Sequence, residues 1–255
     1  MILRRITEHV KNQNWFAVAL DFLIVVAGVF IGIQVANWNE VRQFNTQEAT
    51  YLLQLRDEIQ SNAAAAQLQS PYLDLVISGG ETGLAFLEGD GTCLSSCEEL
   101  VISFFHASQL WGTPFSDEKY QEVTRLGLPT DQTARDIIQE LYLFLIGGNS
   151  INATPPPYRE RVRGHFSFDT STALWRDCHQ ALSGGFEALS FNCRDALSAI
   201  DLTATLERIY ADKELATMLR YWLGQNELAR QTNYKREALS GTALAAIDKT
   251  LGANE

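Results

Sequence analysis

The chain has 255 residues, 46% hydrophobic and 20% charged, which is enough to bury a sizeable core in one or two domains. Its formal net charge is −11, and residues 1–38 contribute +1 (Arg4, Arg5 and Lys11 against Glu8 and Asp21), so the remainder carries −12. This acidic body has no long lysine or arginine run, which excludes a nucleic-acid partner, since neutralising phosphates supplies most of such affinity.

The first predicted element is an apolar stretch of 24 residues from Trp15 to Trp38. As a helix it would span roughly 36 Å, enough to cross a bilayer, with a tryptophan at each interface. The basic residues precede it, which predicts a cytoplasmic tail at 1–14 and export of everything after residue 38. A cleaved signal peptide is the alternative. The stretch is longer than a usual signal core, and Gln34 stands where a small residue would be needed before Ala36, so we expect an uncleaved anchor.

Small and polar residues interrupt the apolar stretch. Gly28 and Gly32 form a small-x-x-x-small face that Ala36 continues, which is typical of helix contacts within lipid. Asp21 lies roughly 9 Å inside Trp15. It is interpreted as an interfacial carboxylate that pairs with a basic residue of the tail, with a proton-handling group in a transport or motor complex as the alternative.

Residues 39–70 predict a helical stalk that continues the membrane helix, because no proline or glycine occurs between Trp38 and Pro71. Apolar residues recur along it at helical spacing and predict a stripe that packs against the exported domain or a neighbouring copy: Phe44, Tyr51, Leu52, Leu55 and Ile59.

Residues 71–255 predict a periplasmic helical domain. Pro71 opens a second helix, weakened by Gly79 and Gly80 and ended by a Gly-Asp-Gly turn. Further helices are predicted in "EELVISFFHASQL", "SDEKYQEVTRLG" and "TDQTARDIIQELYLFLIGG", with Ser116 and Thr130 as candidate N-caps. The apolar end "LYLFLIGG" is too short for a second span and is assigned to the core.

Three consecutive prolines, Pro155 to Pro157, forbid a helix interior and mark a possible subdivision at 152–157. Beyond them, "STALWRDCHQALSGG" and the residues from Ala204 to Leu251 have helical period, with one buried face marked by Leu215, Met218, Leu219 and Trp222. No alternating strand series occurs. The exported part is therefore predicted to be an all-α bundle.

All four cysteines lie on the side predicted to be exported, and an even count in an oxidising compartment predicts disulfides. Short loops favour pairing Cys93 with Cys97 and Cys178 with Cys193. The alternative is a zinc site of four cysteines, or one that includes His179, although neither pair has the usual Cys-x-x-Cys spacing.

No motif of catalysis, phosphate binding or cofactor binding occurs, so we predict no enzyme, cofactor or metal. The histidines at 9, 106, 165 and 179 are scattered and are interpreted as core or surface residues, and the glycines at 79–83 and 184–185 as turns. If the chain after Pro157 is extended, four residues share one side as a basic strip for an acidic partner or a lipid headgroup: Arg159, Arg161, Arg163 and His165. The alternative is a solvated loop that pairs with nearby carboxylates.

The run "DFLIVVAGVFIGIQVANWNEVRQ", followed by "EATYLLQLRDEIQSN", resembles a bacterial family of single-pass membrane proteins of unknown function. Asp21 stands where that family usually has Glu, Gly28 and Gln34 match its glycine and glutamine, and the exit matches at Asn37, Trp38, Asn39 and Glu40. The match covers roughly residues 15–62. The resemblance implies the anchor and the stalk, suggests that Asp21 and Gln34 belong to a shared membrane contact, and supplies no activity.

These patterns together predict a bacterial inner-membrane protein with a periplasmic body. Its expected role is to assemble with itself or to serve as an accessory subunit of a larger complex of integral membrane proteins, because polar residues in a lone span are most easily explained by protein contacts. The alternatives are a periplasmic sensor or ligand-binding module at the strip from Arg159 to His165, and a proton-coupled subunit that uses Asp21.

Overall fold

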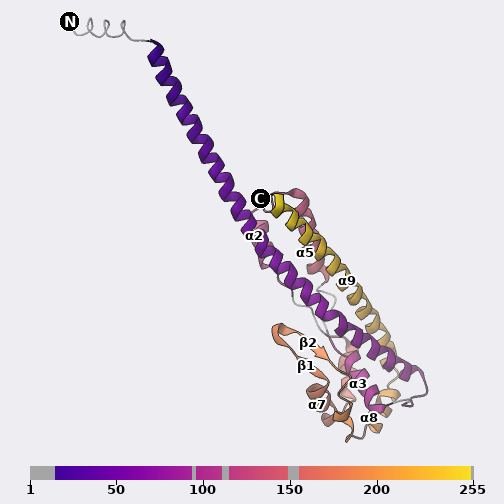
Figure 1. Ribbon diagram of the computed structural model, residues 1–255. Coiled ribbons are helices and arrows are strands. Elements are labelled where there is room, and N and C mark those ends of the chain that lie inside the picture. Colours follow the sequence, from indigo (N-terminus) through magenta and orange to yellow (C-terminus); the bar gives the residue numbers. More distant parts are fainter. Residues whose placement is uncertain (1–14, 94–95, 111–114, 149–154, 254–255) are drawn as a thin grey trace, which may run out of the picture. The chain divides into compact units, whose positions relative to one another are not determined.

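The computed structural model describes residues 15–93, 96–110, 115–148 and 155–253 (Figure 1). The chain is mostly helical, which confirms the all-α prediction, with one short two-stranded hairpin that the sequence did not indicate. Its contacts divide it into two units, residues 1–51 and residues 52–253.

Helix α2 runs from Trp15 to Glu88 and contributes to both units. The prediction that a new helix begins at Pro71 is wrong, because α2 passes through this proline without a break. A proline inside a helix removes one backbone hydrogen bond, and its ring crowds the carbonyl four residues earlier, at a cost of about 3 kcal/mol. The residues that follow it are buried, Tyr72 at 3% exposure, Leu73 at 2% and Val76 at 0%, and this packing holds the helix together across the defect.

The glycines at 79–83 lie inside α2 and are not turns. A Cβ atom at Gly79 would lie 2.8 Å from the backbone oxygen of Ser103, and one at Gly83 would lie 2.8 Å from the ring of Phe104. Both contacts are with α3 (Cys97–Ala107), so the glycines allow the two helices to approach closely. The low helix propensity of glycine can be predicted from the sequence, whereas the close helix packing that requires glycine at these positions cannot.

Helices α4 (Glu118–Arg125) and α5 (Gln132–Gly148) occupy predicted positions, but their first turns are not capped as predicted. Asp117, and not Ser116, is the N-cap residue of α4, and its side chain makes no capping hydrogen bond. At α5, Asp131 precedes the first helical residue and accepts a hydrogen bond from the amide of Thr133 at 3.0 Å. Only about half of the apolar end of α5 is core: Leu141 and Leu145 are fully buried, whereas Leu143 and Ile146 are 61% and 51% exposed.

The cap of α4 comes from α2. The carboxylate of Glu58 accepts hydrogen bonds from the amides of Lys119 at 2.9 Å and Tyr120 at 3.2 Å, and from the hydroxyls of Ser116 at 2.7 Å and Tyr142 at 2.6 Å. Burial raises the pKa of Glu58, but these four hydrogen bonds outweigh it and keep the pKa below its ordinary value. A carboxylate at a helix N-terminus is favoured by the helix dipole and by the free amides there.

The region between the prolines and the C-terminal helices is built from short elements. They are α6 (Pro157–Gly164), α7 (Phe168–Asp177), β1 (His179–Ala181), β2 (Glu187–Leu189), and the 3₁₀ turns η1 (Ser183–Gly185) and η2 (Arg194–Leu197). The strands pair antiparallel, with His179 opposite Leu189. The helix predicted to run on to residue 185 therefore ends at Asp177, and the hairpin takes its place.

Two helices complete the second unit, α8 (Thr203–Ala211) and α9 (Leu215–Ala253). The predicted face of α9 is confirmed: Leu215, Leu219 and Trp222 are buried and Met218 packs against the core. That core lies where α3, α6, α7, α8 and the start of α9 meet the end of α2, and the indole of Trp222 donates to the carbonyl of Ala107 at 2.8 Å.

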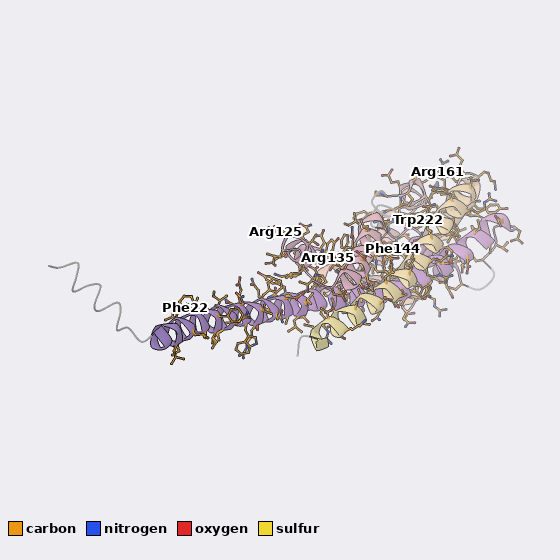
Figure 2. The ribbon with its side chains drawn as sticks, turned by 90° about the horizontal axis from the view of Figure 1, so that it is seen from above. Phe22, Arg125, Arg135, Phe144, Arg161 and Trp222 are labelled. Atoms are coloured by element: carbon orange, nitrogen blue, oxygen red, sulfur yellow. A yellow bond between two sulfur atoms is a disulfide. The ribbon has the colours of Figure 1, made fainter. Side chains whose placement is uncertain are left out.

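Helices α9 and α2 run antiparallel within the second unit. Ion pairs join them along their length, Arg56 with Asp248 at 3.2 Å, Asp74 with Arg230 at 3.5 Å and Glu88 with Arg220 at 3.4 Å. Helix α5 packs against α9, where the ammonium of Lys235 lies 5.1 Å from the ring centre of Phe144 (Figure 2). Each exposed ion pair contributes little stability. Together the three pairs show which residues of α2 lie opposite which residues of α9.

Candidate functional site

Three of the four basic residues after Pro157 lie on α6 and the fourth, His165, is its C-cap, so the prediction of an extended basic strip is wrong. Pro156 is the extended N-cap of α6 and Pro157 its first residue, where a fixed φ and a missing amide cost nothing. In a helix, residues four apart share a face. Arg159 and Arg163 therefore lie on one face, and Arg161 and His165 on another.

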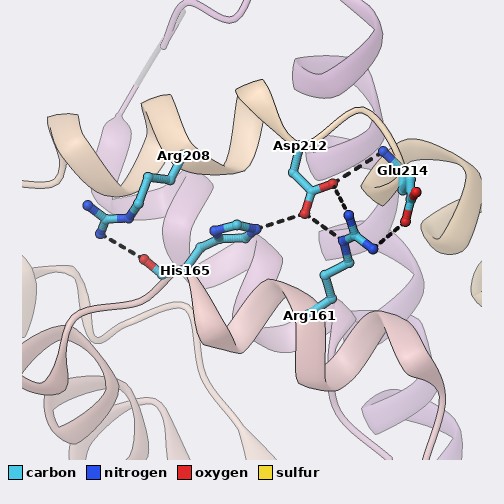
Figure 3. A network of polar contacts seen from close by, with 5 residues as sticks. All are labelled: Arg161, His165, Arg208, Asp212 and Glu214. Atoms are coloured by element: carbon cyan, nitrogen blue, oxygen red, sulfur yellow. Dashed lines mark hydrogen bonds and ion pairs between the residues drawn. The ribbon is translucent and has the colours of Figure 1, made fainter.

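Arg161 and His165 belong to a network of polar contacts with the turn between α8 and α9 (Figure 3). Arg161 donates from Nε and Nη2 to the two oxygens of Asp212, at 2.6 and 2.8 Å, and from Nη1 to Glu214. His165 Nε2 lies 2.9 Å from Asp212 Oδ2, and its carbonyl accepts from Arg208 at 2.9 Å. The hydrogen bonds from Arg161, with a smaller contribution from His165, outweigh partial burial and hold the pKa of Asp212 at about 2.

This network joins the end of α6 to the turn between α8 and α9. The guanidinium of Arg161 is occupied by two carboxylates and His165 by one, so neither presents a free cation to a partner. Here the interpretation as surface charges that pair with nearby carboxylates describes the contacts correctly, although they lie on a helix and not in a loop.

Arg159 and Arg163 point to the end of α3. Arg159 Nη1 donates to the carbonyl of Ser108 at 3.0 Å, and Arg163 Nε donates to the Ser108 hydroxyl at 2.8 Å. Ser108 is the C-cap of α3, so the two cations meet the negative end of the helix dipole. The guanidinium carbon of Arg163 also lies 4.8 Å from the ring centre of Trp175 and 5.3 Å from that of Phe105.

Three further polar residues lie near this pair, the buried Tyr72 and the partly buried His179 and Glu187. We call these five residues the arginine cluster: Tyr72, Arg159, Arg163, His179 and Glu187. The Tyr72 hydroxyl donates to Glu187 Oε2 at 3.1 Å, and His179 Nε2 lies 3.2 Å from the same oxygen. Burial, and next the negative charge of Glu187, raise the pKa of Tyr72. Burial, and next the neighbouring Arg159, lower the pKa of Arg163 to about 10. The cluster thus holds two guanidinium groups and one carboxylate.

Sequence reasoning missed Tyr72 and Glu187 as partners of the arginines. Tyr72 is far away in the chain, and Glu187 reaches the site through the hairpin. The one available signal was the Cys178 to Cys193 bracket, which ties the ends of the hairpin segment together. Of the other histidines, His106 is fully buried in α3, where burial lowers its pKa to about 4 and keeps it neutral.

The apolar half of α2 is a second candidate surface. Ten large apolar side chains between Phe22 and Val35 are each at least 49% exposed, and Phe22 projects from the helix in Figure 2. By length and composition, α2 is the one described helix able to cross a membrane. The side chains of Trp15 and Asp21 lie outside the described part of the structure, and Trp38 is 65% exposed.

The residues predicted for helix contact do not all share a face. At about 100° per residue, positions 21, 28, 32, 39, 46 and 50 fall within about 40° of one another, and we call them the glycine face. Ala36 flanks this face, whereas Gln34 lies about 140° away. A Cβ atom at Gly28 or Gly32 would meet nothing within 4 Å.

The glycine face continues into polar residues beyond Trp38. Asn39, Thr46 and Thr50 line one open groove together with Arg42, Gln43 and Gln47. The Thr46 and Thr50 hydroxyls donate to carbonyls one turn earlier, both at 2.9 Å, which satisfies them within the helix. Of the predicted stalk stripe, Leu52, Leu55 and Ile59 are fully buried in the second unit, Tyr51 is partly buried and Phe44 is 45% exposed.

The cysteines form the two disulfides that the short loops favoured, with Cα atoms 5.4 Å apart for Cys93 and Cys97 and 5.3 Å for Cys178 and Cys193. All four thiols are therefore used, which removes the four-cysteine zinc site. Within the described ranges, no group of three or more His, Cys, Asp or Glu side chains is placed to hold a metal ion.

Compared with known proteins, the chain matches no family model, no curated protein and no solved structure.

Proposed function

We propose that the protein is a single-pass inner-membrane protein that works by assembling, with itself or with other integral membrane proteins. The observation that carries this proposal is the apolar surface of α2 from Phe22 to Val35, exposed on every side of the helix. Water would penalise such a surface heavily, whereas lipid solvates it, and a helix satisfies its own backbone groups there.

The proposed orientation puts the N-terminus in the cytoplasm and the second unit in the periplasm. Basic residues precede the apolar stretch, and both disulfides lie beyond it. Positive charge is retained in the cytoplasm, and disulfides persist in oxidising compartments. These two observations are independent and support the same topology.

The proposed contact is the glycine face. In lipid, helices associate through close packing and polar contacts, and two glycines one turn apart permit the closest approach. Gly28 and Gly32 have open space around them, and Asn39, Thr46 and Thr50 extend the same face with small or uncharged side chains. The face is therefore suited to a second helix lying alongside it.

The test is association in native membranes, solubilised in mild detergent. Replacing both glycines, Gly28→Leu with Gly32→Leu, is expected to remove the partner helix by filling the space it needs. The matched control is Ala27→Leu with Val26→Phe, which adds bulk at two positions off the glycine face. Recovery of a monomer alone from the wild type, or equal loss in both variants, would contradict the proposal.

A second candidate function, an anion-binding module, is suggested by the arginine cluster, which contains two half-buried guanidinium groups and one carboxylate. An inorganic phosphate or dicarboxylate titration followed by thermal unfolding tests it, with Arg163→Gln as the variant and Arg161→Gln as the control. A proton-coupled role of Asp21 would show itself differently, as loss of function with intact assembly in Asp21→Asn.

A further inference from the structure

The two disulfides differ in access. Cys178 and Cys193 are 0% and 5% exposed and belong to the core, whereas Cys93 and Cys97 are only partly buried. Thiol–disulfide exchange requires a thiolate to reach one sulfur of the bond, so the rate depends on access to that sulfur. The core disulfide is shielded from such an attack as long as the second unit stays folded.

A cavity of about 360 Å³ opens beside the partly buried Cys93–Cys97 disulfide, and Cys93 is one of its lining residues. The remaining lining combines apolar and hydroxyl side chains with two carboxylates: Thr82, Ala85, Phe86, Thr92, Asp90 and Glu99 among them. This volume lies at the lower end of the range of ordinary ligand pockets. Cys93 lines the cavity and Cys97 does not, which makes the sulfur of Cys93 the expected point of attack.

Cys97 is placed as the leaving group. It is the first residue of α3, which has eleven residues and an N-cap at Ser96. The N-terminus of a helix stabilises a thiolate, and a thiol of lower pKa leaves faster. Two acidic residues in the same turn partly oppose this effect, although Glu98 is hydrogen bonded to Ser96 Oγ at 2.7 Å and Glu99 lies 3.4 Å from Arg194.

The loop that carries Cys93 is held independently of the disulfide. The ring of Tyr210 packs against Gly91, which has φ +77°, and its hydroxyl donates to the carbonyl of Gly89 at 3.1 Å. Asp90 accepts from the amide and the hydroxyl of Thr92, at 3.0 and 2.6 Å. On the other side, Ser96 Oγ accepts from the amide of Glu99 at 3.2 Å. Both cysteines are therefore anchored by local contacts, and opening the bond leaves them near each other.

We propose that Cys93–Cys97 is an exchangeable disulfide that oxidises a dithiol segment of a neutral or basic polypeptide. A thiolate of the partner attacks Cys93 Sγ, and the S–S bond breaks with its electron pair going to Cys97. The second partner thiol then attacks the mixed disulfide and releases Cys93. Two electrons pass to the protein, which ends as a dithiol, and the partner ends as a disulfide. The carboxylates of Asp90 and Glu99 attract a dithiol segment that carries basic residues and repel one that carries acidic residues.

The first test uses the full chain in mild detergent and two synthetic dithiol peptides, one flanked by lysines and one by glutamates. After alkylation, mass spectrometry maps the reduced cysteines. The expected result is reduction of Cys93 and Cys97 alone, faster with the basic peptide by about tenfold at low salt. Asp90→Asn with Glu99→Gln should remove that preference. Reduction of both disulfides together, or of neither before unfolding, would overturn the proposal.

A second test identifies the attacked sulfur. Cys97→Ser leaves the thiol of Cys93 at the cavity, and Cys93→Ser leaves that of Cys97. With a basic peptide activated as a mixed disulfide, and with rates compared at an alkaline pH where both thiols are ionised, Cys97→Ser should form the stable adduct faster, because its remaining thiol lines the cavity. Circular dichroism checks that both variants are folded. Equal rates would contradict the assignment, because the two sulfurs would then be reached without the cavity. A fall in unfolding temperature in Cys97→Ser as large as that in Cys178→Ser would also contradict it, because the Cys93–Cys97 bond would then be needed for the fold.

Discussion

The two halves of α2 share one helical backbone but differ in the exposure of their apolar side chains. From Phe22 to Val35 the apolar side chains are exposed on all sides, and the glycines there have open space around them. From Leu52 to Phe86 a stripe of apolar residues is buried, and the glycines at 79–83 are in close contact with α3 or α9. Similar residues therefore have different consequences, because the environment and not the residue type decides what each one contributes.

The largest expected effect is on the exposed half. Val26→Arg with Phe30→Arg introduces two charges into the centre of the apolar stretch, at a cost of about 6 kcal/mol if that stretch lies in lipid. Membrane fractionation is expected to show loss of integration. The control adds the same charge beyond the stretch, with Gln43→Arg and Gln47→Arg. A double variant that still fractionates with membranes would show that this half is not solvated by lipid.

In the packed half, Leu55→Ala should lower the free energy of unfolding by about 2–5 kcal/mol, because Leu55 is fully buried and a cavity would remain. Leu53, two residues earlier, is 46% exposed, so Leu53→Ala should cost no more than about 0.5 kcal/mol. Thermal or denaturant unfolding in detergent measures both. Equal losses would mean that the stripe is not the packing surface of this half.

Removing the negative charge of Glu58 should have a smaller effect. Glu58→Gln weakens charge-assisted hydrogen bonds to α4 and is expected to cost about 1.5–3 kcal/mol at neutral pH. The folded pKa of Glu58 lies below its ordinary value of 4.5, so its contribution is present above that value and is lost as the pH falls through the folded pKa. The variant should therefore lose less stability than the wild type between about pH 6 and about pH 3. Glu81→Gln, at an exposed position of α2, is the control and should follow the wild type.

The smallest effects compare glycines in the two halves. Gly79→Ala puts a Cβ atom 2.8 Å from a backbone oxygen, and we expect it to cost about 1–3 kcal/mol of unfolding free energy. Gly32→Ala meets nothing within 4 Å and gains up to about 1 kcal/mol of helix propensity, so it should not destabilise the chain. Helix content and unfolding temperature, measured for both variants, test this difference. A loss of stability of similar size in Gly79→Ala and Gly32→Ala would contradict it.

The sequence predicted what depends on local pattern. Helix periodicity located most helices, the apolar stretch marked the exposed half of α2, and short loops gave the disulfide pairing. What it could not predict depends on partners far away in the chain. Local pattern predicts a helix break at Pro71, because the burial of Tyr72 and Val76 depends on the rest of the fold. It predicts turns at the glycines of 79–83, because the close approach of α3 and α9 there is a tertiary feature.

The candidate site shows the same limit. The arginines after Pro157 were recognised as a group, but their division into two faces depends on Pro156 acting as an N-cap. Their partners, Ser108, Glu187 and Asp212, come from three other parts of the chain. No local signal joins them.

The cap that Glu58 provides for α4 has a consequence for how the molecule folds. Helix α4 has only eight residues, fewer than a helix needs to persist by itself in water. Its first amides are satisfied by a residue that precedes them by about sixty positions. The order of events is thereby constrained: the second half of α2 must form before α4 becomes stable, and amide hydrogen exchange at Lys119 and Tyr120 reports whether that half of α2 is in place.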